Sequence, residues 1–152
     1  MSVELYVYLR SSEVPTRDAW QQAIEAAGID LVLDAGYDVG QDSGFFPARM
    51  GNYDEDTGFE FYLDPIGDDT SFPEGTDVTE QLADRDVMAA FRFSFDLREC
   101  VAATYAAAAL TQLVNGFFCE EDGDELLDGA QALELARQTD RDVAQHLQRS
   151  GK

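Results

Sequence analysis

The stretch "VMAAFRFSFDLRECVAATYAAAALTQLVNG", residues 87–116, carries the strongest structural pattern in the chain. Phenylalanine alternates with polar residues from 91 to 95, which predicts a strand with one buried face. Asp96 follows as a predicted helix cap, and an apolar stripe then recurs every three or four residues from Cys100 to Val114. Because further alanines surround this stripe, we expect this helix to approach a sheet closely and to be the central, mostly buried helix.

The N-terminal half adds strands and at least one helix. Alternating or continuous apolar residues predict strands over 3–9, 29–33, 44–50 and 58–63. A helix is predicted from its cap Thr16 to its stop signal Gly28, and a short helix over 77–85. Pro47 has no N–H to donate, so we expect its strand to be an edge strand or a bulged one.

The C-terminal part predicts a short strand after Gly116 and one long helix. Asp128 and Gln131 form a pattern like a capping box at the start of that helix. Its apolar stripe is interrupted by Asp140, so we expect a looser end towards Leu147. The resulting fold class is α+β: a single, mostly antiparallel sheet of about five strands, packed by three to four helices chiefly on one face. One domain spans 1–148, and the tail 149–152 is frayed.

Composition and charge restrict the kind of partner. The chain has 152 residues, 45% of them hydrophobic, as expected for one globular domain. Its 31 acidic and 10 basic residues give a net charge of −21. Such a field repels nucleic acid and anionic membranes and attracts basic partners. Plain solubility is the alternative explanation of the charge.

The acidic residues are concentrated in predicted loops. Between residues 34 and 86, fifteen acids and two arginines give a net charge of −13, and a second acidic run spans 120–128. Loops on a rigid scaffold are typical recognition surfaces, so we predict partner binding there, with Tyr53 as an exposed aromatic anchor. The predicted partner-binding residues are Asp42, Tyr53, Asp54, Glu55, Asp56, Glu60, Asp68, Asp69, Glu121, Asp122 and Asp124.

The sequence contains no catalytic or metal-binding pattern. The acidic turn that begins at Asn52 lacks the glycine and glutamate of a calcium loop, because Thr57 and Leu63 stand at those positions. The single histidine, His146, lies near the C-terminus, and phosphate-binding glycine loops are absent. We therefore predict no catalytic residue, no metal and no cofactor.

The cysteines and the N-terminal residues bear on the cellular compartment. Cys100 and Cys119 each lie in an apolar segment, which favours reduced, buried thiols. The first ten residues lack the basic start and apolar run of a secretory signal, and no apolar stretch approaches the length of a membrane span. These features predict a cytoplasmic protein.

Three segments carry a resemblance: "ELYVYLRSSEVPTRDAWQQAIEAAGIDLVLD" (4–34), the turn "DSGFFP" (42–47) and "GFFCEEDGDELLDGAQALELAR" (116–137). In pattern they resemble small, acidic bacterial proteins similar to the immunity proteins of polymorphic and contact-dependent toxin systems. The resemblance implies a cytoplasmic inhibitor that covers the active site of one cognate toxin, one-to-one. Many such toxins are basic nucleases, which acidic loops would complement.

Our leading hypothesis is therefore a non-enzymatic immunity protein with a basic toxin as partner, and a homodimer remains open. One alternative is a small-ligand-binding or hydrolytic module at the strand-to-helix junction near Ser94 and Asp96, where a helix N-terminus is exposed. The simpler interpretation of that junction, which we favour, is that Asp96 caps the helix and Ser94 faces solvent. Another alternative is an acidic housekeeping protein without a specific partner.

Overall fold

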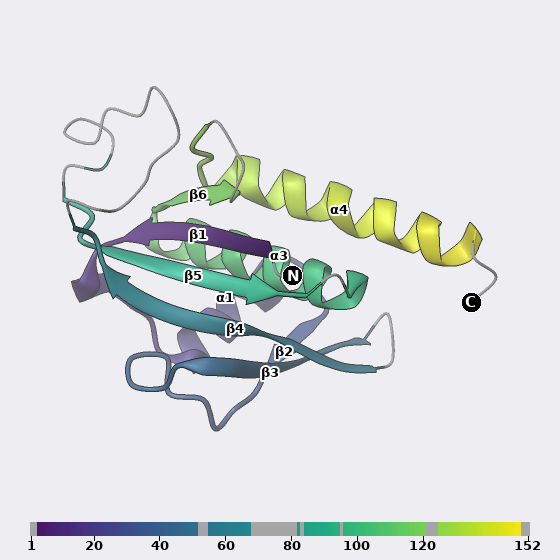
Figure 1. Ribbon diagram of the computed structural model, residues 1–152, viewed down its shortest axis with the longest axis horizontal. Helices are drawn as coiled ribbons and strands as arrows, with labels where there is room; N and C mark the ends of the chain where they lie inside the picture. The colour runs from purple at the N-terminus through teal and green to yellow at the C-terminus, as the bar shows by residue number, and fades with distance from the viewer. Residues whose placement is uncertain are drawn as a thin grey trace.

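The computed structural model describes residues 3–51, 55–67, 82, 84–94, 96–120 and 125–149, and Figure 1 shows their arrangement. The elements are β1 (Val3–Leu9), the 3-10 turn η1 (Ser11–Glu13), α1 (Arg17–Ala26), β2 (Leu31–Leu33), β3 (Gly44–Met50), β4 (Glu55–Pro65), β5 (Val87–Phe93), α3 (Leu97–Val114), β6 (Phe117–Glu120) and α4 (Gly129–Arg149).

All strand pairs are antiparallel, and they form one sheet in the order β2-β3-β4-β5-β1-β6. The predicted α+β class with a single antiparallel sheet is confirmed. The described residues form six strands, where about five were predicted.

Helix α3 is the centre of the fold. It contacts all six strands, and every residue from Val101 to Thr111 is buried. Small alanine side chains let its axis approach the sheet closely, as the sequence predicted. Asp96 caps its start, since Oδ1 accepts hydrogen bonds from the backbone N–H groups of Arg98 at 2.8 Å and Glu99 at 3.3 Å. Asn115 ends the helix in the left-handed conformation.

An aromatic cluster joins α1 to the inner face of the sheet, the face that α3 covers. The Trp20 ring lies 5.8 Å from Phe46, 5.4 Å from Phe61 and 5.9 Å from Phe91, measured between ring centroids. Its Nε1 donates to the carbonyl of Ala106 in α3 at 3.0 Å. Edge-on and tilted rings of this kind add to the stabilisation from burial, so α1 is fixed against both layers.

The prediction that Pro47 marks an edge or bulged strand is wrong, because β3 pairs with β2 on one side and with β4 on the other. The Pro47 carbonyl accepts from Asp34 N at 3.0 Å, on the side of β2. In an antiparallel ladder the N and O atoms of one residue point to the same side. The nitrogen of Pro47 therefore faces the chain after Leu33, where β2 has already ended. The absence of an N–H at Pro47 thus removes no hydrogen bond between β2 and β3.

The last helix, α4, is held by a capping box at its start and by a hydrogen bond to α3. Its capping box is confirmed: Asp128 Oδ1 accepts from Gln131 N at 2.9 Å, and Gln131 Oε1 accepts from Asp128 N at 3.0 Å. Asp140, which interrupts the apolar stripe, has a partner: its carboxylate accepts a 2.7 Å hydrogen bond from Tyr105 of α3. The polar residue in the stripe is thus a contact between two packed helices.

The opposite face of the sheet, called here the outer face, has a small core of its own at the β5-β1-β6 end. Tyr8, Leu82 and Cys119 are buried there, and Ile66 and Met88 pack around them. Burial raises the pKa of the Tyr8 hydroxyl. The described residues leave the outer face of β2, β3 and the first half of β4 without such a cover.

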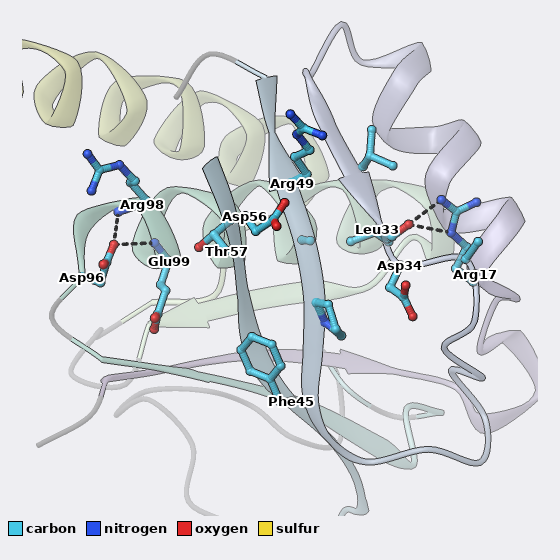
Figure 2. Close-up of a pocket in the computed structure, with 14 residues that line it drawn as sticks. Arg17, Leu33, Asp34, Phe45, Arg49, Asp56, Thr57, Asp96, Arg98 and Glu99 are labelled. Atoms are coloured by element: carbon cyan, nitrogen blue, oxygen red, sulfur yellow. Dashed lines mark hydrogen bonds between the residues drawn. The ribbon is translucent and has the colours of Figure 1, made fainter. Parts of the chain in front are cut away.

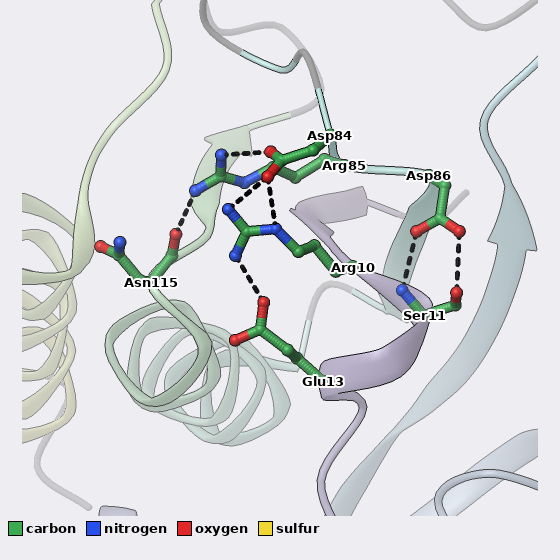
Figure 3. A network of polar contacts seen from close by, with 7 residues as sticks. All are labelled: Arg10, Ser11, Glu13, Asp84, Arg85, Asp86 and Asn115. Atoms are coloured by element: carbon green, nitrogen blue, oxygen red, sulfur yellow. Dashed lines mark hydrogen bonds and ion pairs between the residues drawn. The ribbon is translucent and has the colours of Figure 1, made fainter.

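A polar network closes the end of the sheet next to this small core (Figure 3). Arg10 bonds Asp84 at 2.6 Å, and Arg85 donates to the carbonyl of Asn115 at 2.6 Å. Asp86 accepts from both the backbone N–H and the hydroxyl of Ser11, each at 2.7 Å. The network therefore ties the start of β5 to the end of β1 and to the C-terminal end of α3.

The helix predicted over 77–85 and the frayed tail predicted over 149–152 lie mainly outside the described residues. Within the described part of the chain, no helix combines the length and apolar character needed to cross a membrane.

Candidate functional site

The outer face of β2 and β3 exposes large apolar side chains. Among the described residues, three large hydrophobic side chains are exposed: Val32 (51%), Phe45 (58%) and Leu113 (41%). Val32 and Phe45 lie on neighbouring strands and line the same depression of about 640 Å³, called here the outer-face hollow. Leu113 lies elsewhere, on α3. Exposed apolar groups gathered in a hollow are typical of an interaction surface.

Five parts of the chain line the hollow, and Figure 2 shows how their side chains lie. Arg17 comes from α1, and residues 32–35 come from β2 and the turn after it. Residues of β3 and β4 form the floor. The lining also includes inner-facing Leu33 and Ala48 and the first turn of α3, so the hollow reaches past the strands towards the inner side.

Hydrogen bonds from α1 hold the edge strand β2 in place. The Gln21 side chain is buried; its Nε2 donates to the Leu31 carbonyl at 2.9 Å, and its Oε1 accepts from Leu33 N at 2.8 Å. Arg17 Nε donates to the Leu33 carbonyl at 3.1 Å. The amide of Gln21 thus replaces a neighbouring strand, and Val32 is held facing outwards while both leucines face the core.

Gly58 creates room for the Phe45 ring on the floor of the hollow. A Cβ at Gly58 would lie 2.6 Å from Phe45 Cζ and 2.6 Å from the Phe46 carbonyl oxygen. The φ angle of Gly58 is +155°, which side chains rarely allow. Glycine is therefore required here for β4 to pass under the ring.

The charges around the apolar groups are nearly balanced. Three arginines line the hollow, at positions 17, 49 and 98, and four acids line it, at positions 34, 56, 96 and 99. The strand register places Val32 beside Arg49, and Arg49 opposite Asp56. The hollow is thus a nearly neutral region of a strongly acidic chain.

A second row of side chains crosses the outer face next to the hollow. Phe45 is opposite Glu60, Glu60 is opposite Arg92, and Arg92 is opposite Glu4. Tyr62 donates to Glu60 at 2.5 Å, and this hydrogen bond raises the pKa of Tyr62. These bonds orient the Glu60 carboxylate next to the Phe45 ring.

The structure places three of the predicted partner-binding residues in different settings. Asp56 lines the hollow, and Glu60 lies in the adjoining row. Asp42 is not in the hollow; its Oδ2 accepts from Asp38 N at 2.8 Å within the 34–43 loop. Tyr37 fixes that loop by stacking on Phe46 at 3.8 Å. The backbone of Glu55 belongs to β4. The remaining predicted residues, Tyr53, Asp54, Asp68, Asp69, Glu121, Asp122 and Asp124, lie outside the described residues.

Sequence reasoning missed Val32 and Phe45 as surface residues. One signal was present: in β3, Phe45 alternates in phase with Arg49, whereas Phe46, Ala48 and Met50 are buried. A strand position in phase with arginine is expected to face solvent.

The strand-to-helix junction is occupied by structural hydrogen bonds. Asp96 is the cap of α3, and the Ser94 hydroxyl donates to Glu99 Oε1 at 3.0 Å. The favoured interpretation of Asp96 as a cap and Ser94 as a solvent-facing residue is confirmed, since Ser94 is exposed.

The reactive side chains have environments that disfavour nucleophilic chemistry at neutral pH. Both cysteines are free thiols, and burial raises the pKa of Cys100 and raises that of Cys119 to about 11. His146 is exposed on α4. Within the described ranges, no group of three His, Cys, Asp or Glu side chains could hold a metal ion.

Comparison with models of known protein families and with curated proteins found no match for the chain.

Proposed function

We propose that this chain is a non-enzymatic binding protein that recognises another protein through the outer-face hollow. The observation that carries the proposal is the exposure of Phe45 and Val32 in one hollow on a face that the described residues leave uncovered. Aromatic side chains and arginines dominate the binding energy of protein interfaces, and both types are present here.

The charge of the chain supports a basic partner. A net charge of −21 accelerates association with a basic protein, and Asp56 and Glu60 lie beside the apolar anchors. The partner that fits is a basic protein with an apolar side chain that inserts beside Phe45. In keeping with the resemblance of the sequence, we propose that it is a bacterial toxin, bound one-to-one in the cytoplasm and inhibited by coverage of its active site.

The hydrolytic alternative at Ser94 and Asp96 has less support. Both side chains are engaged in hydrogen bonds that stabilise the start of α3.

The test is a pull-down from cells of the source organism with tagged wild type, Phe45→Ser and Leu113→Ser. Leu113 is the matched control, because it is an exposed apolar residue outside the hollow. We expect a partner that wild type and Leu113→Ser retain and Phe45→Ser loses, with weaker capture at high salt. Equal capture by all three proteins would refute the choice of surface.

The immunity role needs a separate measurement on the captured partner. The purified partner is expressed alone and together with this chain, and cell growth is recorded. Growth arrest that the chain relieves supports the role of inhibitor. A partner that is harmless when expressed alone rules that role out.

A further inference from the structure

A second cavity lies on the inner side of the sheet, where the ends of β1, β5 and β6 face α3 and α4. Its volume is about 180 Å³. Its walls are largely apolar and include Val3, Leu5, Phe93, Leu97 and Leu135. None of its lining residues belongs to the outer-face hollow, so the two sites are separate.

The hydroxyl groups that line this cavity are already satisfied. Thr104 donates to the Cys100 carbonyl at 2.6 Å, and Thr139 donates to the Leu135 carbonyl at 2.9 Å. Ser94 at the rim bonds the Glu99 carboxylate. A ligand therefore meets an interior that offers apolar contact rather than hydroxyl groups.

One charged group completes the lining. Glu120 of β6 is exposed at the rim, and it is the one carboxylate among the described lining residues. Burial raises the pKa of the Cys100 thiol, so that side chain is neutral at neutral pH. The combination of an apolar interior and a carboxylate at the mouth selects a ligand with an apolar body and a cationic end.

We propose that this cavity binds a small hydrophobic amine, with one aromatic ring or a short alkyl chain inside and the ammonium group at Glu120. The volume agrees with such a ligand, because an apolar cavity of roughly 150 Å³ engineered in another protein binds benzene. The strongly negative field of the chain further favours a cation over a neutral or anionic ligand of equal size.

The probes are benzylamine, toluene and benzoate, which share one ring and differ in charge. Binding is followed by NMR chemical-shift titration of the full chain. We expect saturable shifts at residues of the lining, with benzylamine binding roughly twofold to fivefold more tightly than toluene, the range of an exposed ion pair. Benzoate should bind most weakly.

Two charge variants separate the ion pair from the general field. Glu120→Gln should remove the advantage of benzylamine over toluene and leave toluene binding unchanged. Glu25→Gln removes the same charge from an exposed position on α1 outside the lining, so it should preserve the advantage. Equal behaviour of the two variants would overturn the role of Glu120.

A cavity-filling variant tests the location. Cys100→Leu enlarges a half-buried lining residue and should abolish the binding of both benzylamine and toluene. Circular dichroism verifies that this variant is folded; if it is not, Leu135→Phe fills the cavity from α4. Undiminished binding to a folded filling variant, or no saturable shift with wild type at millimolar probe, would overturn the proposal.

Discussion

The replacement Gln21→Met tests how the edge of the sheet is held, on which the position of Val32 depends. Methionine has a similar length and keeps the apolar contacts of this buried position, but it cannot donate to Leu31 or accept from Leu33. The change therefore leaves one buried acceptor and one buried donor of β2 without their partners.

The expected magnitude follows from those two groups. A buried donor or acceptor that loses its partner costs about 1–3 kcal/mol. Because methionine is more favourably buried than an amide, we expect the free energy of unfolding to fall by about 2–4 kcal/mol in total. The Arg17 bond to the Leu33 carbonyl is untouched, so β2 should remain paired with β3 in the folded state.

Urea unfolding followed by circular dichroism measures the change, with Gln22→Met as the matched control. Gln22 is exposed and adjacent, so its replacement should alter stability by less than about 0.5 kcal/mol. Hydrogen exchange of the Leu33 amide should also become faster in Gln21→Met. A stability within about 0.5 kcal/mol of wild type, with a protected Leu33 amide, would refute the reasoning.

Three further perturbations have defined outcomes. Gly58→Ala should lower the free energy of unfolding by roughly 1–3 kcal/mol, since its φ is unfavourable and the new Cβ meets the Phe45 ring. Gly40→Ala is the control, because a Cβ there would meet only Asp38 Oδ1, at an ordinary contact distance of 3.8 Å. Equal effects of the two changes in urea unfolding would contradict this account. Hydrogen bonds from Ser11 lower the pKa of Asp86 in the folded protein below its ordinary value of 3.8. The ionised carboxylate therefore stabilises the folded state at pH values above 3.8, and this contribution is lost as the pH falls through the lower pKa of the folded protein. Asp86→Asn should therefore be less stable than wild type at about pH 7 and converge with it near pH 2, whereas a difference independent of pH would argue against this account. Burial raises the pKa of Cys119 to about 11, so the thiol should react slowly with iodoacetamide at about pH 8. We expect labelling to be roughly tenfold slower in the folded protein than in urea, measured by mass spectrometry of the labelled peptide. Equal labelling rates in the two states would disprove the protection of this thiol.

The fold was largely predictable because its signals are local. Alternation gives β1, β3 and β5 within two residues of their observed ends, and the caps Thr16, Asp96 and Asp128 all accept the predicted backbone hydrogen bonds. The wrong prediction, that Pro47 marks an edge or bulged strand, depends on a partner distant in sequence. Pro47 is tolerated inside the sheet because β2 ends at Leu33, and that end is set by pairing rather than by the residues around Pro47.

The candidate site was less predictable because it depends on which strands meet and on what covers them. A count of acidic residues identifies acidic loops but not the side chains that line a hollow. Asp56 alone lines the hollow among the predicted residues whose side chains are described. Phe45 is exposed because Gly58 of β4 leaves room for its ring and because no helix among the described residues covers the outer face of β3. Neither condition can be read from the composition of the segment.

The hydrogen bonds at the two outer edges of the sheet indicate how a protein partner would bind. Edge strands offer unpaired backbone groups to an incoming strand. At β2 the groups of Leu31 and Leu33 are bonded to side chains of α1, and at β6 Phe118 exchanges two 2.8 Å backbone bonds with Leu127. An added strand would have to displace these bonds, whereas Phe45 on the outer face is exposed without any rearrangement. Recognition at the face would depend on side chains rather than backbone, so it would favour a partner of defined sequence, as the proposed inhibition of one cognate toxin requires.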